Sequence, residues 1–383
     1  MSFFNIDKKC TTTKARTGVL NFDRGQVHTP VFMPIGTLGS VKGLTMNEMN
    51  LLGSEIILGN TYHLWLKPGI EVISHFSGLH NFNTWERPIL TDSGGFQAFS
   101  LSKIRKFTEE GVTFRVASNG DKKFLSPEIS MQIQTELGSD IALVLDECLP
   151  AEVTYKQALN AMNRTYRWAK RSQEEFKRLQ KPDEKYKRRL FGIPQGAQFN
   201  DLREKSAQMI MSLDFEGYSI GGVANGGEPE EIMYSQVLTQ TNILEEHKPK
   251  HLLGVGTPID IVNMVACGID MFDCVYPTRN ARHGSIFIKH TDTEYSSVQI
   301  TAAKFIYDKT PININSKFEE LRTYSRGYLC HLFRSKELLA YRLATLNNIE
   351  YYMDLMNIIR TNINDGNYEE FKNDFKKIDF IKN

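Results

Sequence analysis

Three aspartates in the sequence lie at or near the ends of short apolar runs. Asp92 ends "RPILTD", Asp146 is near the end of "DIALVLDE", and Asp273 lies in "MFDCVYPT". A carboxylate at the end of a strand is usually the N-cap of the helix that follows. Carboxylates that share one pocket can instead work as a nucleophile and as a general acid or base.

Other runs of the same kind end in an amide or in glycine. The residues at or near these ends are Asn60, Gln195, Gly222 and Gly254. Glycine accepts backbone angles closed to other residues, so "IGGVANGGEPEE" (220–231) predicts a loop whose main chain can approach a ligand closely. Helix capping alone does not explain three carboxylates and an amide that all lie at strand ends beside glycines. We therefore expect these residues to share one site.

Eight apolar runs bounded by turn residues predict the strands that position this site. Runs of this length suit parallel strands that are buried on both faces. Helical segments lie between several of them, the longest over 154–179. Eight strands alternating with helices predict a (β/α)₈ barrel, whose reactive side chains gather where the strands end. The runs span 30–37, 55–60, 87–92, 140–147, 189–196, 217–222, 251–256 and 271–278.

A further helix is predicted directly after the fifth run. Its apolar residues recur on one face, and Arg203 falls largely off that face. Asn200 or Asp201 could cap its N-terminus. The predicted inner face consists of Leu202, Ser206, Met209, Ile210 and Leu213.

The composition is that of an ordinary globular chain of 383 residues, with 41% hydrophobic and 24% charged residues. No apolar run is long enough to span a bilayer, and the N-terminus lacks a signal-peptide core. Five cysteines without C-x-x-C spacing predict reduced thiols in the cytoplasm. Because the net charge is +1, a nucleic-acid surface must be a local patch. The candidate clusters, which could equally be solvated faces, are "RWAKR" (167–171), "KYKRR" (185–189) and "RNARH" (279–283).

Six long motifs resemble those of one enzyme family, the tRNA-guanine transglycosylases or queuine tRNA-ribosyltransferases. The resemblance implies a (β/α)₈ barrel with a small zinc-binding excursion near its end. It also implies that guanine at the wobble position of a tRNA is exchanged for a 7-deazaguanine, queuine or preQ1. The motifs, in order between about Thr29 and Tyr352, are "TPVFMPIGTLGSVKGLT", "LGNTYHLWLKPG", "LTDSGGFQAFSL", "LSPEISMQIQTELGSDIALVLDEC", "MFDCVYPTRNARHG" and "YSRGYL".

The resemblance also implies catalytic and RNA-binding roles. Asp273 matches the nucleophile that bonds to ribose C1′, as carboxylates do in retaining glycosidases. Asp92 matches the acid/base residue, although it could instead bind the ribose or the base. Arg279 and Arg282 match residues that read the uridines beside the target guanine.

Recognition of the base falls, by the same resemblance, to a second group of residues. Asp146 suits the N1–H and 2-amino edge of guanine, while Gln195 and the backbone N–H of Gly222 suit O6. Phe96 and Leu253 would cover the two faces of the ring. A site that pairs the donors of the substrate can reject the wrong base strongly.

The glycine-rich loop bears on which deazaguanine enters. In family members, the carbonyl at the position of Val223 contacts the aminomethyl arm of the base. Asn225, Gly226 and Gly227 favour a roomier pocket, which would suit queuine. The choice between queuine and preQ1 stays open.

The zinc ligands that the resemblance implies are missing from this sequence. When the chain is aligned on "YSRGYL", Ser316, Phe318, Leu321 and Asn347 occupy the positions of the three cysteines and the histidine. Serine and asparagine do not replace thiolate and imidazole at a structural zinc site, so we expect no zinc and no other cofactor. Phe318 and Leu321 predict a miniature apolar core in place of the metal, and a disordered excursion is the alternative.

These expectations divide the chain into a main barrel (1–288), a small β-rich excursion (289–334), and the last barrel helix with a tail (335–383). The implied partners are a tRNA with a GUN anticodon, the deazaguanine base and a second copy of the chain in a homodimer. An alternative is a catalytically impaired tRNA-binding or partner subunit, which the three retained aspartates disfavour. A relative acting in the tRNA D-arm is disfavoured because no additional C-terminal RNA-binding domain is evident.

Overall fold

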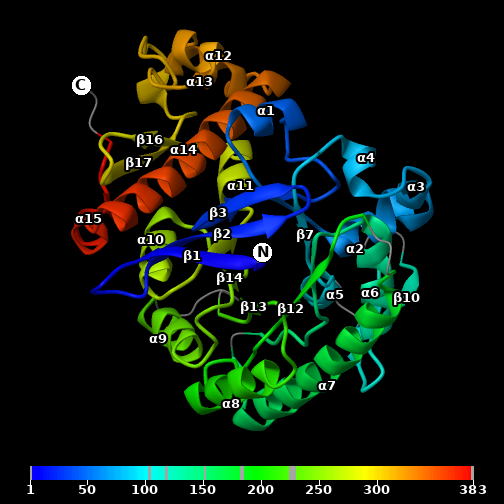
Figure 1. The fold of residues 1–383 in the computed structure, drawn as a ribbon. Coiled ribbons are helices and arrows are strands. Elements are labelled where there is room, and N and C mark those ends of the chain that lie inside the picture. Colours follow the sequence, from blue (N-terminus) through cyan, green and yellow to red (C-terminus); the bar gives the residue numbers. More distant parts are fainter. Residues whose placement is uncertain are drawn as a thin grey trace.

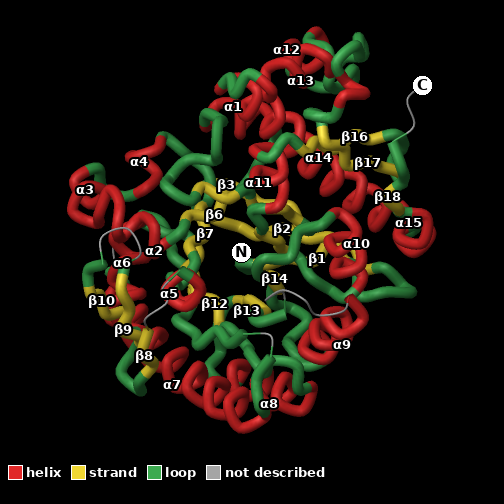
Figure 2. The backbone as a smooth tube through the Cα atoms, turned by 180° about the vertical axis from the view of Figure 1, so that it is seen from behind, coloured by secondary structure: helices red, strands yellow, loops and turns green. Residues whose placement is uncertain are grey.

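A computed structural model shows a barrel of parallel strands surrounded by helices (Figures 1 and 2). The strand order is β4-β15-β14-β13-β12-β11-β7-β6-β5. Because β4 and β5 are consecutive parts of one strand on either side of Pro34, the two ends of the sheet meet and an eight-stranded barrel closes. The predicted (β/α)₈ barrel is therefore confirmed. The structure describes residues 2–101, 105–116, 120–150, 152–181, 185–223 and 230–380.

The barrel strands coincide with the eight predicted runs. Most of these strands are buried along their whole length, since side chains fill the interior and helices cover the outside. They are β4 (Val31–Met33), β5 (Ile35–Gly36), β6 (Ile57–Gly59), β7 (Ile89–Thr91), β11 (Ile141–Leu143), β12 (Arg189–Gly192), β13 (Gly217–Ile220), β14 (Lys250–Leu252) and β15 (Met271–Asp273).

Long helices form the outer layer of the barrel (Figure 2). The predicted helix over 154–179 is confirmed as α7, which begins in a capping box between Thr154 and Gln157. These helices are α6 (Pro127–Leu137), α7 (Tyr155–Leu179), α8 (Asn200–Met211), α9 (Glu230–Thr241), α10 (Pro258–Ala266) and α14 (Leu338–Asp365). Shorter ones are α1 (Met46–Leu51), α2 (Thr61–Leu64), α3 (Ile70–His75), α4 (Leu79–Asn83), α5 (Gly95–Ser100), α11 (Tyr276–Arg282), α12 (Glu319–Thr323), α13 (Arg326–Arg334) and α15 (Tyr368–Asp374).

Helix α8 corrects two details of the prediction. Its N-cap residue is Phe199, and no side chain caps the helix, whereas Asn200 or Asp201 was expected there. The Asp201 carboxylate instead accepts a hydrogen bond from Tyr155 on α7, at 2.6 Å. Arg203, expected largely off the inner face, is fully buried because backbone carbonyls surround its guanidinium group.

Two antiparallel sheets outside the barrel were not predicted. The first leads directly into β4, so it lies across the N-terminal end of the barrel, where Arg16 pairs with Asp270 at 2.7 Å just before β15. The second is inserted between α5 and α6. The strands are β1 (Phe4–Lys9), β2 (Arg16–Phe22) and β3 (Gly25–Thr29) in the first, and β8 (Arg105–Phe107), β9 (Val112–Arg115) and β10 (Lys122–Leu125) in the second.

The segment after α11 starts with the hairpin of β16 (Ser285–Lys289) and β17 (Glu294–Gln299), which β18 (Lys376–Lys377) joins. Beyond the hairpin, the predicted β-rich excursion is mainly helical, which corrects that expectation. Helix α13 is capped by the Ser325 hydroxyl and buries Leu329, Cys330, Leu332 and Phe333. Figure 1 shows α12 and α13 together beside α14, at one edge of the barrel.

The residues at the four positions aligned with zinc ligands make hydrogen bonds and apolar contacts with other parts of the protein. The Ser316 hydroxyl donates to Oε2 of Glu350 on α14 at 2.5 Å, and the Lys317 N–H donates to Oε1 at 2.7 Å. Asn347 donates to the Phe287 carbonyl at 2.9 Å. Phe318 and Leu321 are buried, but they belong to the main hydrophobic core and not to the separate miniature core that was expected.

Candidate active site

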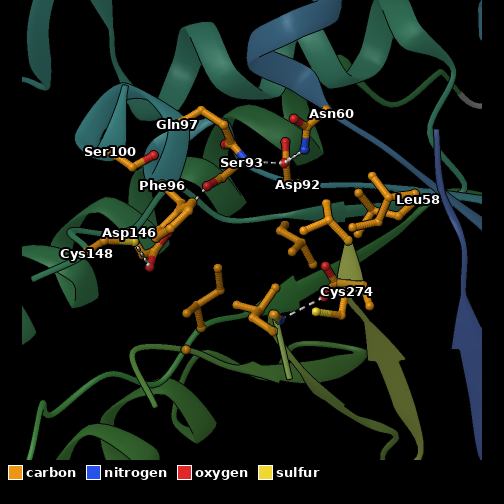
Figure 3. A pocket seen from close by; sticks show the side chains of 18 of the residues that line it. Leu58, Asn60, Asp92, Ser93, Phe96, Gln97, Ser100, Asp146, Cys148 and Cys274 are labelled. Atoms are coloured by element: carbon orange, nitrogen blue, oxygen red, sulfur yellow. Dashed lines mark hydrogen bonds between the residues drawn. The ribbon is translucent and has the colours of Figure 1, made fainter. Parts of the chain in front are cut away.

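A cavity of about 570 Å³ opens at the C-terminal ends of the barrel strands (Figure 3). Most of the predicted site residues line it. Val223 does not; it is buried next to Gly222. Arg282 is exposed one helical turn beyond Arg279 and does not line the cavity either. The predicted residues on the cavity wall are Asp92, Phe96, Asp146, Gln195, Gly222, Leu253, Asp273 and Arg279.

Asp273 is the last residue of β15, and its side chain is 11% exposed. Its Oδ1 accepts a hydrogen bond from the Gly254 N–H at 3.2 Å. Gly254 lies two residues after β14 and has a φ of +73°, a conformation that favours glycine. The carboxylate is thus fixed by the barrel backbone at the edge of the cavity.

Asp92 directly follows β7 and is held by three donors. The Thr61 N–H donates to Oδ1 at 2.8 Å, Gln97 donates to Oδ2 at 3.0 Å, and Asn60 also donates to Oδ2. Figure 3 shows Asp92 beside Asn60. Burial raises the pKa of Asp92 to about 7, and the charge of Asp273 adds to this, although the Thr61 and Gln97 hydrogen bonds act in the opposite direction. Near neutral pH, this carboxyl can either give or take a proton.

Asp146 and Gln195 form a buried polar pair on another part of the wall. Gln195 Nε2 donates to Asp146 Oδ2 at 2.6 Å, and Ser93 donates weakly to Oδ1 at 3.4 Å. Burial raises the pKa of Asp146, while the Gln195 hydrogen bond lowers it. Cys148 lies beside the same carboxylate (Figure 3), and burial with the nearby Asp146 charge raises the pKa of its thiol.

The paired glycines after β13 are required by the close approach of Gln195. A Cβ on Gly222 would lie 2.4 Å from Gln195 Oε1, and one on Gly221 would lie 2.8 Å from Nε2. Gly222 also has a φ of +68°. The main chain of this turn thus lies close to the Gln195 side chain, while its predicted approach to a ligand stays a prediction. The adjoining prediction on Asn225, Gly226 and Gly227 falls outside the described residues.

Sequence reasoning missed Arg203 as a support of this loop. Its guanidinium donates to the Gly221 carbonyl at 2.8 Å, the Gly222 carbonyl at 2.6 Å and the Ala197 carbonyl at 2.8 Å. Arg203 thereby ties α8 to the turns that carry Gln195 and the glycines. Helical periodicity alone places an arginine outside, and only the three-dimensional structure reveals the carbonyls that satisfy it.

The three basic clusters differ in their surroundings. In "RWAKR", Arg167 pairs with Glu109 at 2.5 Å and Arg171 pairs with Glu128 at 2.7 Å. In "KYKRR", Arg188 is buried. "RNARH" alone among the three places a residue, Arg279, on the cavity wall.

The comparison with known families decides the assignment of the chain. A family model described as "TGT: Queuine tRNA-ribosyltransferase" matches residues 10–379. The chain belongs to the queuine tRNA-ribosyltransferase family. It is 49% identical over 361 residues to the queuine tRNA-ribosyltransferase of Neisseria meningitidis serogroup A, covering 94% of each chain. It is also similar to the proteins of that name from Chromobacterium violaceum, at 48%, and Francisella tularensis subsp. novicida, at 47%, each over 372 residues and 97% of each chain.

Two further predictions for this member of the queuine tRNA-ribosyltransferase family concern its cysteines and membrane-spanning segments. All five cysteines are free in the structure. Along the described part of the chain, no helix is both long and apolar enough to cross a membrane.

Proposed function

We propose that this protein exchanges guanine at the wobble position of a tRNA with a GUN anticodon for a 7-deazaguanine base, through a covalent bond between Asp273 and ribose C1′. One observation carries the proposal. Asp273 and Asp92 line the same cavity, close enough for the charge of one to raise the pKa of the other. Two carboxyls in one cavity, one of them with a pKa raised to about 7, can supply a nucleophile and a general acid.

Each half of the exchange needs both carboxyls. In the first half, Asp273 attacks C1′, the C1′–N9 bond breaks, and guanine leaves with a proton supplied by Asp92. In the second half, the incoming base attacks C1′, the bond to Asp273 breaks, and Asp92 takes up the proton that the base releases. The sugar configuration is retained through two displacements, and no nucleotide or redox cofactor is consumed.

Base selection falls to the Asp146–Gln195 pair. The Asp146 carboxylate would accept from N1–H and the 2-amino group of guanine, while Gln195 and the Gly222 N–H would donate to O6. These groups are already oriented by their mutual hydrogen bond and by the Gly221–Gly222 turn. Phe96, 47% exposed at the rim, and the partly buried Leu253 are available to cover the ring. Adenine offers the opposite pattern of donor and acceptor and would leave buried groups unpaired.

The anticodon loop is recognised, in this proposal, by Arg279 and Arg282 on α11. The helix begins three residues after the proposed nucleophile, so both arginines lie on the element that follows the attacking carboxylate. Arginine reads exposed loop bases by stacking and by donating in a fixed fork. The Val223 carbonyl is the proposed contact of the aminomethyl arm, and both queuine and preQ1 remain as incoming bases.

The excursion, in the same proposal, holds no zinc. Ser316 and Asn347 use their polar groups on Glu350 and Phe287, while Phe318 and Leu321 have no donor atoms. Within the described residues, no cluster of three or more His, Cys, Asp or Glu side chains could hold a metal ion. We further propose a cytoplasmic homodimer. Exposed apolar residues in and beside the excursion support a protein contact there, namely Tyr307, Ile314 and Leu338.

Exchange of labelled guanine into tRNA tests the proposed reaction. We expect incorporation into a tRNA whose anticodon begins G-U and none into the same tRNA with adenosine in place of that guanosine. Asp273→Ala supplies the background. If wild type incorporates no more label than this variant but still binds the tRNA, the protein is a partner subunit. Added queuine and preQ1 compete with guanine, and their relative potency identifies the preferred base.

A further inference from the structure

A histidine within the seventh apolar run lies directly behind Asp273. His251 is the middle residue of β14 and is fully buried. Its Nε2 is 2.8 Å from Asp273 Oδ1 on the neighbouring strand β15. Its Nδ1 is 3.0 Å from the hydroxyl of Ser219, its register partner on β13. A hydroxyl, an imidazole and a carboxylate thus form one row across three adjacent strands.

The row gives the two oxygens of Asp273 different surroundings. Oδ1 faces His251 Nε2 and accepts the Gly254 N–H. Among the described residues, none donates a hydrogen bond to Oδ2. We propose that His251 is a positioning residue that, with the Gly254 N–H, holds Oδ1 and leaves Oδ2 to attack ribose C1′. This inference rests on the proposed function, because it assigns a role within the exchange reaction.

The contacts of the imidazole determine where its proton lies. A carboxylate oxygen at Nε2 accepts a hydrogen bond from N–H there, and the Ser219 hydroxyl can donate to Nδ1, so the tautomer with its proton on Nε2 satisfies both neighbours. The row has the residue types of a hydrolase triad, but its order toward the cavity is reversed. Ser219 is fully buried and Asp273 lines the cavity, so the carboxylate is the member that can meet a substrate.

The hydrogen bonds from His251 and the Gly254 N–H to Oδ1 have their largest effect in the second step, when the bond between Asp273 and the sugar breaks. As Oδ2 bonds to C1′, the C1′–N9 bond breaks, guanine departs with the electron pair and Asp92 supplies its proton. Oδ1 becomes the carbonyl oxygen of the ester and keeps both N–H contacts. When the incoming base attacks C1′, the C1′–Oδ2 bond breaks and negative charge returns to the carboxylate. Hydrogen bonds to a charged acceptor are the stronger ones, so His251 favours this second step.

The test compares His251→Leu, which removes the donor, with His251→Gln, which keeps an N–H near the position of Nε2. The preformed RNA–protein adduct is chased with guanine, so that the second step is timed by itself. We expect His251→Leu to slow the chase about 10- to 100-fold with an unchanged KM for tRNA. His251→Gln should recover to within about 5-fold of wild type. A wild-type chase rate in His251→Leu, or equal losses in both variants, overturns the proposal.

A matched control is a second buried histidine–aspartate pair. His80 lies 3.0 Å from Asp140, which precedes β11 at the opposite end of the barrel. His80→Leu should lower the melting temperature without slowing the chase, which separates positioning from general destabilisation.

Nitrogen-15 NMR of histidine-labelled wild type shows which ring nitrogen of His251 carries the proton. This measurement depends neither on activity nor on whether His251→Leu folds. We expect one of the nine histidines to show a protonated Nε2 and a bare Nδ1 that are absent in His251→Gln. A bare Nε2 at His251 overturns the positioning role. The wild type could instead show the expected tautomer and yet exchange no base. That result would overturn the proposed function but leave the hydrogen-bonded row of Ser219, His251 and Asp273 intact.

Discussion

The barrel mouth and the excursion differ in how they relate to the family pattern. At the mouth, the matching aspartates and Gln195 are all present, and each makes contacts that fix its orientation. In the excursion, the four positions aligned with zinc ligands hold other residues, and Glu350 and the main core take up the local contacts. A change at the proposed nucleophile removes the group that reacts, whereas in our proposal hydrogen bonds and apolar packing join the chain segments of the excursion without a metal.

A change at Asp92, the proposed proton donor at the barrel mouth, should lower activity more than any change in the excursion. We expect Asp92→Asn to lower guanine exchange about 10²–10⁴-fold, since a positioned acid/base group contributes this much. Asparagine can still accept from the Thr61 N–H, but its Nδ2 faces the Gln97 and Asn60 donors, so a lower melting temperature should accompany the loss of exchange. Steady-state exchange and thermal melting of the same sample check both statements. An exchange rate close to wild type would remove Asp92 from the chemistry.

The raised pKa of Asp92 predicts a pH dependence with a definite sign. Below about pH 7 the carboxyl is protonated and can donate to the departing guanine; as pH rises through about 7 it loses that proton. Single-turnover release of guanine should therefore fall through this range in wild type and be flat in Asp92→Asn. A profile that rises with pH, or one that is identical in the variant, contradicts the acid role.

Asp146→Asn tests whether Asp146, at the barrel mouth, recognises the N1–H and 2-amino edge of the base. The amide presents a donor where guanine offers N1–H and a 2-amino group, so we expect kcat/KM for guanine to fall roughly 10²–10³-fold. Hypoxanthine lacks the 2-amino group, so it should inhibit the incorporation of labelled base by wild type less strongly than unlabelled guanine does. The difference in inhibition between the two bases should shrink in Asp146→Asn. If it persists unchanged, Asp146 does not read this edge of the base.

Glu350→Ala probes the excursion and should leave the chemistry of the mouth intact. The change leaves the Ser316 hydroxyl and the Lys317 N–H without their buried acceptor, each at about 1–3 kcal/mol of folding stability. Ser316→Ala, which removes one of the two donors, should cost less. Urea unfolding gives the stabilities, and exchange per folded molecule should match wild type. A loss of exchange without a loss of stability would tie the excursion to catalysis.

Burial also raises the pKa of Glu350 above its ordinary value. The folded protein therefore holds the Glu350 proton more tightly than the unfolded chain, so this group contributes most stability at low pH. Its contribution declines as pH rises from the ordinary glutamate pKa toward the raised one. Glu350→Gln should flatten that part of the stability curve. A decline of equal size in the variant would assign it to other groups.

Chelation should have the smallest effect. We expect less than stoichiometric zinc in the purified protein and no change in exchange or melting temperature after treatment with EDTA. One zinc per chain, or activity lost to EDTA and restored by zinc, would show that the excursion is a metal site after all.

The barrel could be predicted from the sequence because strands buried on both faces read as short apolar runs with turn residues at their ends. The β8–β10 sheet was not predicted, because its strands are only three or four residues long, are largely exposed in β8 and β10, and carry no such run. The excursion was expected to be β-rich, but its buried residues follow helical spacing once the hairpin ends.

Within the site, residue types and strand ends identified Asp92, Asp146 and Asp273, because each directly follows or ends an apolar run. Their pairing with distant polar residues was not predictable. Asn60 meets Asp92 across 32 residues of sequence, and His251 reads as part of an apolar strand until the fold places Asp273 beside it. The raised pKa of Asp92 likewise arises from burial and a neighbouring charge, which only the closed barrel creates.

The bond between protein and RNA is the central claim, and isolating it is the most direct test. Wild type incubated with a GUN-anticodon tRNA, without added base, and then denatured should show a protein band shifted by the mass of the RNA. Peptide mapping should place the sugar on Asp273, and Asp273→Asn should form no such band. A band that persists in this variant, or one that maps to another residue, contradicts the account.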